Sequence, residues 1–197
     1  RWDILTNDNI LIKLPQNNLS ESLDLAHKII SSNDFKKLNI GTYPVISKAK
    51  YEKNFTYIEN YDTEGENVFI CDTFAGDGRG DLTIHYYNGR CNYTNLIHKI
   101  EVPDNLNTKY LYYILTSDMT IFNSKFQNGS SKPTLDKTKL KKNFKIPLPS
   151  LEIQEQCITL FEQKEAYIES IDKKIAEHKN YLEELKALAK DIITSFC

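Results

Sequence analysis

The sequence predicts an α+β protein, in which a compact domain with a mixed, largely antiparallel sheet (residues 1–149) precedes a long coiled-coil-type helix (residues 150–197). In the first part, short β-branched and aromatic runs alternate with glycine and Asn-Gly turns, as in small sheets. The prolines of Ile146-Pro-Leu-Pro-Ser150 then exclude a continuous helix. Beyond them the chain has no glycine or proline and is rich in Glu, Lys, Leu and Ile, which favours a helix.

The first part is expected to hold two helices and several strands. Ser20–Ser31 has apolar residues at positions 23, 25, 26, 29 and 30, a helical spacing, and a second helix is expected from Thr108 through Leu115 to Phe122. Four strand candidates share β-branched or aromatic content and flanking turns: Tyr43–Ser47, Asn67–Asp72, Asp81–Tyr87 and Leu96–Val102. Short strands around one or two helices indicate a twisted sheet, not a doubly wound one.

The last element is predicted to begin after Ser150, a good N-cap residue, with Glu152 complementing the helix dipole. A stripe then recurs in steps of three and four residues: Ile168, Ile171, Ile175, His178, Leu182, Leu185, Ala189, Ile192 and Phe196. This spacing is typical of a coiled coil, so the helix needs a partner helix. His178 is best interpreted as a polar residue of the stripe, with a ligand or pH-switch role as the less favoured alternative.

Charge is unevenly distributed along the chain. The net charge is −2, but residues 35–150 carry sixteen bases and twelve acids, giving +4, whereas residues 151–197 carry six bases and ten acids, giving −4. Lys125–Lys145 alone contains seven lysines and one acid, Asp136. This asymmetry indicates an anionic partner for the first part, although a lysine-rich loop is often only a solvated surface.

Composition also limits the location of the protein and its bound groups. The four cysteines form no C-x-x-C pair or metal-like spacing, so we expect free thiols in a reducing cytoplasm. No apolar stretch approaches the roughly 18 residues that a membrane span needs. The first residues also lack the basic and apolar regions of a signal peptide. We therefore expect a cytoplasmic protein without membrane contact, metal or cofactor.

Two segments resemble catalytic motifs. Phe74-x-Gly76-x-Gly78 is similar to the cofactor loop of S-adenosylmethionine-dependent methyltransferases, but those glycines open a helix, whereas residues 81–87 are strand-like. An Asn-Pro-Pro-Tyr or Asp-Pro-Pro-Tyr tetrapeptide is also absent. Glu162-Gln-Lys164 has the letters of a nuclease motif but falls in the helix, and the four histidines are dispersed. No catalytic residue is predicted, and a small methyltransferase remains the competing enzyme interpretation.

The positive signals concern nucleic acid. Lysines, hydroxyls and backbone amides suit phosphate contacts, while Arg and Asn side chains can read base edges. Such residues cluster in four segments of the first part. The candidate DNA-binding residues are Lys48, Lys50, Lys53, Arg79, Arg90, Asn92, Tyr93, Ser130, Ser131, Lys132 and Lys139.

The segment from Ile146 to Gln156, Ile-Pro-Leu-Pro-Ser-Leu-Glu-Ile-Gln-Glu-Gln, resembles a junction in the specificity subunits of type I restriction–modification systems. In that family it joins a target recognition domain to a conserved helical region. Other segments follow in the family's order: Gly41–Ser47, Asn67–Asp72, the Gly76/Gly78/Gly80 turn, Ile84–Gly89, Tyr110–Leu115 and Gly129–Pro133. The resemblance covers roughly residues 40 to 197.

The resemblance implies a sequence-specific DNA recognition subunit without catalytic residues. Members of the family carry two recognition domains joined by two antiparallel helical regions, and they direct adenine methyltransferase and endonuclease subunits to a bipartite site. Residues 1–149 would be the recognition domain and residues 150–197 the spacer. The implied partners are double-stranded DNA, a methyltransferase subunit, a restriction subunit and a second helix. The helix would be contacted through Ile168, Ile171, Ile175, Leu182, Leu185, Ile192 and Phe196.

Only one such unit is present, which leaves several arrangements open. The chain is interpreted first as a half-subunit that dimerises through its helix. It could also be the second half of a full subunit, which the missing initiating Met permits, or the recognition domain of a fused DNA adenine methyltransferase. A purely structural coiled-coil adaptor is a further alternative. The bases that the chain would read cannot be deduced from its sequence.

Overall fold

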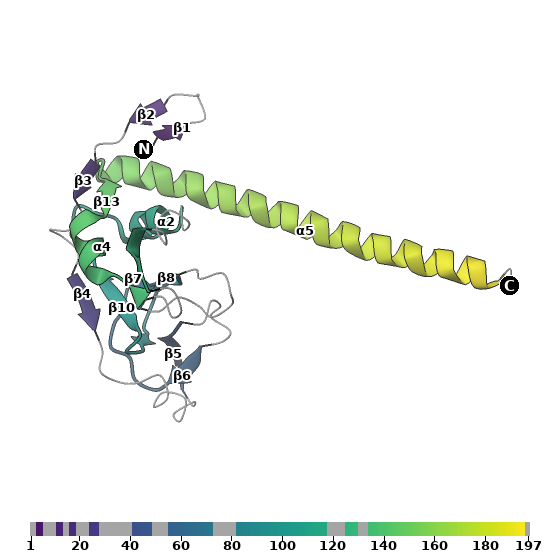
Figure 1. Cartoon of the computed structure of the whole chain (residues 1–197), viewed down its shortest axis with the longest axis horizontal. Coiled ribbons are helices and arrows are strands. Elements are labelled where there is room, and N and C mark those ends of the chain that lie inside the picture. Colours follow the sequence, from purple (N-terminus) through teal and green to yellow (C-terminus); the bar gives the residue numbers. More distant parts are fainter. Residues whose placement is uncertain are drawn as a thin grey trace. The chain divides into compact units, whose positions relative to one another are not determined.

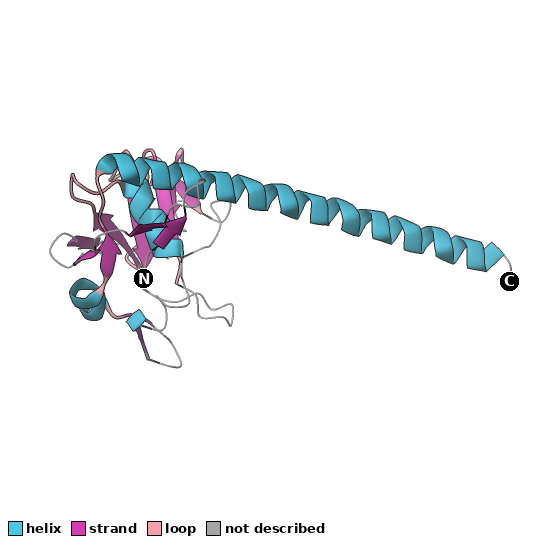
Figure 2. Cartoon of the chain, turned by 90° about the horizontal axis from the view of Figure 1, so that it is seen from above, coloured by secondary structure: helices cyan, strands magenta, loops and turns pink. Residues whose placement is uncertain are grey.

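The structure is a computed structural model that describes residues 3–5, 11–13, 16–18, 24–27, 41–48, 55–72, 82–117, 125–129 and 134–195. It divides into two compact units, Arg1–Glu155 and Gln156–Cys197. The first unit combines small, mostly antiparallel sheets with short helices (Figure 1), and the second belongs to a single long helix (Figure 2). The predicted α+β class is confirmed.

A four-stranded antiparallel sheet forms the centre of the first unit. Its order is β4 (Asp24–His27), β10 (Ile97–Glu101), β7 (Glu66–Cys71) and β8 (Ile84–Asn88). From Asn67 onward every residue of β7 is buried, because the strand has neighbours on both edges and α2 (Thr108–Ser117) packs against β7 and β8. Helix α2 buries an apolar and aromatic set: Tyr110, Leu111, Tyr113, Ile114 and Leu115.

A second sheet has the order β6 (Thr56–Ile58), β5 (Tyr43–Ile46) and β9 (Asn92–Tyr93). Strands β5 and β9 run parallel, with Val45 opposite Asn92. His85 of β8 connects the two sheets, because its Nε2 lies 3.0 Å from the carbonyl oxygen of Ser47 and its ring packs edge-on against Phe55. Burial lowers the pKa of His85, and the hydrogen bond to Ser47 partly opposes that effect.

The remaining elements of the first unit are short. Hairpins or pairs join β1 (Asp3–Leu5) to β2 (Leu11–Lys13), β3 (Gln16–Asn18) to β13 (Lys145–Pro147), and β11 (Gln127–Asn128) to β12 (Thr134–Leu135). Helix α4 (Lys137–Asn143) follows β12, and the carboxylate of Asp136 caps it by accepting a hydrogen bond from the Lys139 amide at 2.9 Å.

Most of the predicted elements are present. Strands are confirmed at β5, β7 and β10, while β8 begins at Ile84, three residues later than expected. Helix α2 is confirmed to Ser117, and residues 118–122 of that prediction lie outside the described residues. The helix predicted over Ser20–Ser31 is wrong at Asp24–His27, which forms β4. Pairing with the edge of β10 satisfies these backbone groups and overrides the helical spacing.

The long helix α5 runs from Leu151 to Ser195, directly after the predicted proline hinge. Gln154 in its first turn is completely buried. Its Oε1 accepts a hydrogen bond from the Asn107 amide at 2.7 Å, and its Nε2 donates to the carbonyls of Asn105 and Pro149. Tyr110 donates its hydroxyl hydrogen to the Pro147 carbonyl. The hinge is therefore tied by side chains to the loop that starts α2.

Replacing Gln154 by leucine should destabilise the fold. The apolar side chain would leave the half-buried Asn107 amide and the Asn105 and Pro149 carbonyls without their side-chain partner, and the loss of such a hydrogen bond costs roughly 0.5–1.5 kcal/mol. Thermal unfolding followed by calorimetry should show a clearly lower melting temperature. Gln163→Leu, at an exposed position of the same helix, is the matched control. Equal melting temperatures for the two variants would contradict this role of Gln154.

Acid should weaken the contact between the two sheets through His85. Because its folded-state pKa is lowered, the unfolded chain binds a proton more readily as pH falls below 6.5. The contribution of His85 to the free energy of unfolding is therefore fully present above pH 6.5, and it decreases as pH falls toward the folded-state pKa. Urea unfolding at about pH 7.5 and about pH 5 should show a smaller loss in His85→Gln than in the unaltered chain. His178→Gln, on the exposed helix, serves as the control, and an unchanged loss in His85→Gln would refute the expectation.

Candidate nucleic-acid interface

The C-terminal end of β7 is a meeting point of several chain segments. The Cys71 amide donates to the Thr83 carbonyl at 3.0 Å, and the Asp72 amide donates to the Leu96 carbonyl at 2.8 Å. The Asp72 carbonyl in turn accepts a hydrogen bond from the Leu135 amide at 2.8 Å. The start of β8, the connection before β10, and β12 are therefore joined at one end of the central sheet.

The end of β5 lies at the same place. Ser47, directly after β5, is bonded to His85 near the start of β8, and the Thr94 amide donates to the Ile46 carbonyl. We term this region the β7 edge, meaning the edge of the central sheet at which β7 ends. It is defined by the described residues Ser47, Lys48, Phe55, Asp72, Leu82, Thr83 and Thr134–Lys139.

Three lysines lie at the β7 edge. Lys48 and Lys139 are predicted DNA-binding residues, and Lys137 is a neighbour of Lys139 in α4. Lys48 is exposed, and its positive charge acts on Cys71, although burial dominates and raises the pKa of that thiol to about 12. Lys137 and Lys139 of α4 have side chains that are 44% and 55% exposed. Each ammonium is paired with an aspartate at 3.4 Å, Lys137 with Asp72 and Lys139 with Asp136. The edge therefore presents three cations on two short segments, the residues after β5 and the start of α4.

Six further predicted DNA-binding residues lie outside the described residues: Lys50, Lys53, Arg79, Ser130, Ser131 and Lys132. The described residues that flank them belong to the β7 edge in most cases. Segment 49–54 lies between Lys48 and Phe55, segment 73–81 between Asp72 and Leu82, and segment 130–133 ends at Thr134. The glycines of the methyltransferase-like motif also fall within segment 73–81.

Arg90 lies at the other end of β7. The register pairs Glu66, the first residue of that strand, with Asn88, just before Arg90. Arg90 donates from Nε to Glu64 at 3.2 Å, and its guanidinium stacks over the Tyr61 ring at 4.9 Å. Hydrogen bonds to Tyr43 and Glu64 raise the pKa of Arg90.

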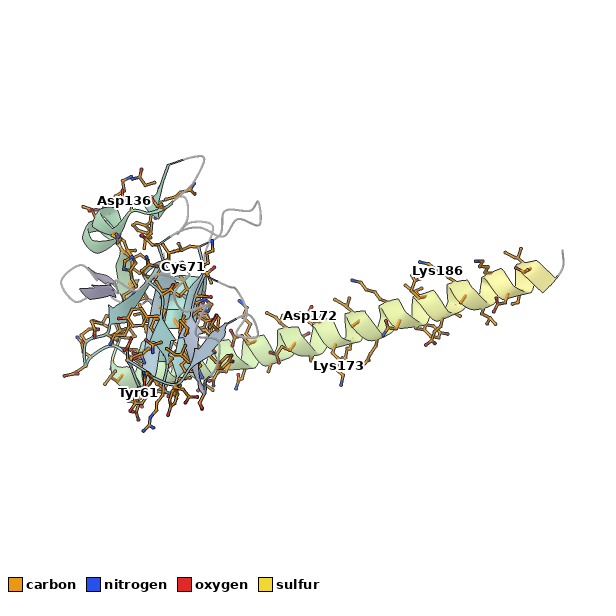
Figure 3. All side chains as sticks on the ribbon, turned by 90° about the horizontal axis from the view of Figure 1, so that it is seen from below. Tyr61, Cys71, Asp136, Asp172, Lys173 and Lys186 are labelled. Atoms are coloured by element: carbon orange, nitrogen blue, oxygen red, sulfur yellow. The ribbon has the colours of Figure 1, made fainter. Side chains whose placement is uncertain are left out.

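Figure 3 shows the two ends of the first unit. Tyr61, beside Arg90, and Asp136, beside α4, lie on opposite sides of Cys71. The Arg90 end also exposes four acids, Glu59, Asp62, Glu64 and Glu66. Arg90 is therefore separated from the lysines with which it was predicted to act.

Asn92 and Tyr93, also predicted to contact DNA, are buried. The side-chain nitrogen Nδ2 of Asn92 donates to the Asn60 backbone carbonyl at 2.7 Å. The Tyr93 ring packs against Phe69, with centroids 5.4 Å apart. These side chains hold β9 inside the fold, so the structure places them away from a surface ligand. The sequence pattern around Gly89 did not distinguish a buried strand from an exposed turn.

His98 and Asp72 form a contact that the dispersed spacing of the histidines did not reveal. His98 of β10 is 2% exposed, and its Nε2 lies 3.4 Å from Oδ1 of Asp72. The cross-strand register places His98 opposite Ile70 and His85 opposite Phe69, on the two strands that flank β7. His98 and His85 therefore lie on opposite sides of β7, each opposite a residue near its C-terminal end.

The predicted stripe lies on an exposed part of α5. Every described residue from Glu162 to Thr194 is exposed, and this stretch includes Glu162 and Lys164 of the nuclease-like motif. Figure 3 shows Asp172, Lys173 and Lys186 projecting from the helix. Six predicted interface residues are between 37% and 54% exposed: Ile168, Ile171, Ile175, Leu182, Leu185 and Ile192. Phe196 lies outside the described residues, and Nδ1 of His178 lies 2.7 Å from the Lys174 carbonyl.

Among the residues that the structure describes, no group of three or more His, Cys, Asp or Glu side chains is arranged to hold a metal ion. Within the same ranges, no helix has the length and apolar character that a membrane crossing requires.

Solved structures share this fold. The S subunit of a type I restriction–modification system from M. genitalium aligns with a TM-score of 0.63 and 15% identity, covering 85% of this chain and 42% of that one. A structure described under complex assembly and conformational transition of the type I R-M system gives a TM-score of 0.65 and 18% identity, with coverages of 88% and 45%. The HsdS subunit of Thermoanaerobacter tengcongensis gives 0.55 and 17%, with 79% and 38%.

Sequence comparisons agree. A putative type I restriction enzyme specificity subunit of Haemophilus influenzae is 31% identical over 109 residues, which are 54% of this chain and 26% of that protein. The chain thus spans about a quarter of that curated relative. The family model of the type I restriction modification DNA specificity domain matches residues 18–180. The chain therefore belongs to the type I restriction–modification DNA specificity family, the non-catalytic specificity component of these systems, as its sequence predicted.

Proposed function

We propose that this chain recognises DNA for a type I restriction–modification system and binds the duplex with the β7 edge. The observation that carries the proposal is the gathering of Lys48, Lys137 and Lys139 at this edge. The segments holding most of the other candidate DNA-binding residues are attached there too. Recognition residues are commonly found in segments that follow the end of a rigid sheet, because the sheet fixes where each segment begins.

The distribution of charge supports this orientation on DNA. Phosphate contacts by lysines supply most sequence-independent affinity and position a protein for base reading. The opposite end of β7 exposes Glu59, Asp62, Glu64 and Glu66, and Arg90 is paired with one of these acids. A polyanion is attracted to the lysine end and repelled from the acidic end, so the domain is oriented before any base is read.

The helix α5 is proposed to set the distance to a second recognition domain and so to read a bipartite target. Its 45 residues correspond to about 70 Å at the usual rise per residue. Six stripe residues exposed by at least 37% favour pairing with another helix of this kind. We propose a second copy of the chain as partner, and the assembled helices as the docking site for a methyltransferase subunit and, through it, a restriction subunit.

Neutralising one basic side chain at each end of the sheet tests the DNA-binding proposal. Lys139→Gln should weaken binding of a fluorescently labelled, mixed-sequence duplex at low salt by roughly three- to ten-fold. It should also reduce the slope of log affinity against log salt, by at most about 1 because Lys139 is paired with Asp136 in the free chain. The Asp136 cap is retained in this variant, because it accepts from the backbone amide of Lys139.

Arg90→Gln is the charge-matched control at the opposite end and should leave both quantities close to those of the unaltered chain. The reverse result, a loss in Arg90→Gln and none in Lys139→Gln, would place the DNA at the acidic end and overturn the proposed orientation. Absence of any DNA affinity at low salt would favour the structural adaptor.

Self-association through α5 is tested by adding charge to the stripe. Ile175→Lys should convert a dimer to a monomer in analytical ultracentrifugation, because a lysine in the seam leaves a charge to be buried. Ala187→Lys adds the same charge at an exposed position on the outer side of the heptad pattern and should remain dimeric. If the unaltered chain is already a monomer, the half-subunit interpretation fails. The helix would then need sequence from a longer subunit or from a fused methyltransferase.

A further inference from the structure

Asp72 is held firmly at the β7 edge by its backbone. Its amide donates to Leu96 and its carbonyl accepts from Leu135, both at 2.8 Å. The preceding residue, Cys71, is completely buried at the end of the central strand. Displacing Asp72 would break hydrogen bonds to two segments, so its carboxylate has a fixed origin in the fold.

The carboxylate of Asp72 contacts two basic side chains through the same oxygen. Its Oδ1 lies 3.4 Å from Nε2 of His98 and 3.4 Å from Nζ of Lys137. His98 is a buried residue of β10. Lys137 is the first residue of helix α4, and its side chain is 44% exposed. One neighbour of the carboxylate therefore lies in the interior, and the other extends from it toward solvent.

This arrangement places an anion where the proposed DNA phosphates would approach. To contact a phosphate, Lys137 must leave Asp72 or share its charge between two anions, and the 25% exposed carboxylate also repels the phosphate directly. Both effects act on DNA of any sequence, because they concern the backbone alone. They therefore lower affinity for target and non-target duplexes alike, and the difference between the two is left to the base contacts.

We propose that Asp72 is a positioning residue that restrains Lys137 and lowers the sequence-independent affinity of the β7 edge for DNA. The inference rests on the proposed function, in which the β7 edge faces the duplex. It assigns to an acidic side chain of this surface a role in limiting phosphate binding, opposite to that of the lysines around it.

The first test is Asp72→Asn in the full chain, with a labelled mixed-sequence duplex as the probe. The substitution keeps the size of the side chain and both backbone hydrogen bonds. Affinity should increase roughly three- to ten-fold at low salt, and the salt slope should steepen by about 1, because Lys137 becomes available to a phosphate. Glu59→Gln removes an equal charge at the acidic end and should change affinity clearly less.

The second test separates restraint of Lys137 from a general effect of charge. In a Lys137→Met background, Asp72→Asn should raise affinity by less than about two-fold, so the two substitutions should be strongly non-additive. Additive effects, or an Asp72→Asn variant that folds normally and binds no more tightly, would overturn the proposal.

A third comparison leaves Asp72 unchanged, in case Asp72→Asn does not fold. Lys48→Met should reduce the salt slope by about 1, whereas Lys137→Met should reduce it by clearly less, since Lys137 is already held by the carboxylate. Equal reductions of the salt slope in the two variants would show that Asp72 does not restrain Lys137, although the β7 edge would still be the DNA-binding surface. If neither lysine variant nor Lys139→Gln alters the slope, the proposed interface itself fails and the inference fails with it.

Discussion

The rest of the structure depends on the complete burial of one strand, β7. Val68, Phe69, Ile70 and Cys71 have no exposed surface, so every polar group of their backbone needs a partner within the fold. Antiparallel pairing with β10 and β8 provides those partners, and α2 packs against β7 and β8. The strand consequently has two well-separated ends, and the chemistry of the surface is divided between them.

The two ends differ in charge although the composition of the chain is almost balanced. The end that carries Asp72 holds lysines of α4 and Lys48, whereas acids occupy the end that carries Arg90. Net charge alone would argue against a nucleic-acid partner. In this domain the separation of charge along the sheet is the informative quantity, because a rigid polyanion responds to local potential rather than to the total.

The local features of the sequence predicted the fold well, whereas the long-range features were not accessible from it. Alternation and turn residues located β5, β7 and β10, and the prolines before Ser150 located the start of α5. The helical spacing of Ser20–Ser31 was misleading, since the open edge of β10 determined the conformation of Asp24–His27. Spacing along a chain does not reveal cross-strand register.

The same limit applies to the candidate site. Lys48 and Lys139 were identified from composition, and the structure places both at the β7 edge. Arg90 was grouped with them because of its neighbours in sequence, but the antiparallel return of β8 carries it to the opposite end. Asp72 was predicted only as the last residue of a strand, because its contacts with His98 and Lys137 depend on residues 26 and 65 positions away.

The uninterrupted exposure of α5 from Glu162 to Thr194 bears on the amount of assembled protein that a cell can maintain. A helix that buries its apolar stripe only on assembly has a stability that depends on the concentration of its partner. If α5 pairs as proposed, chains made in excess of the partner would keep an extended apolar surface, open to proteases and to unintended helices. Supply of the recognition component would then be matched to that of its complex by degradation of the surplus, without a dedicated regulator.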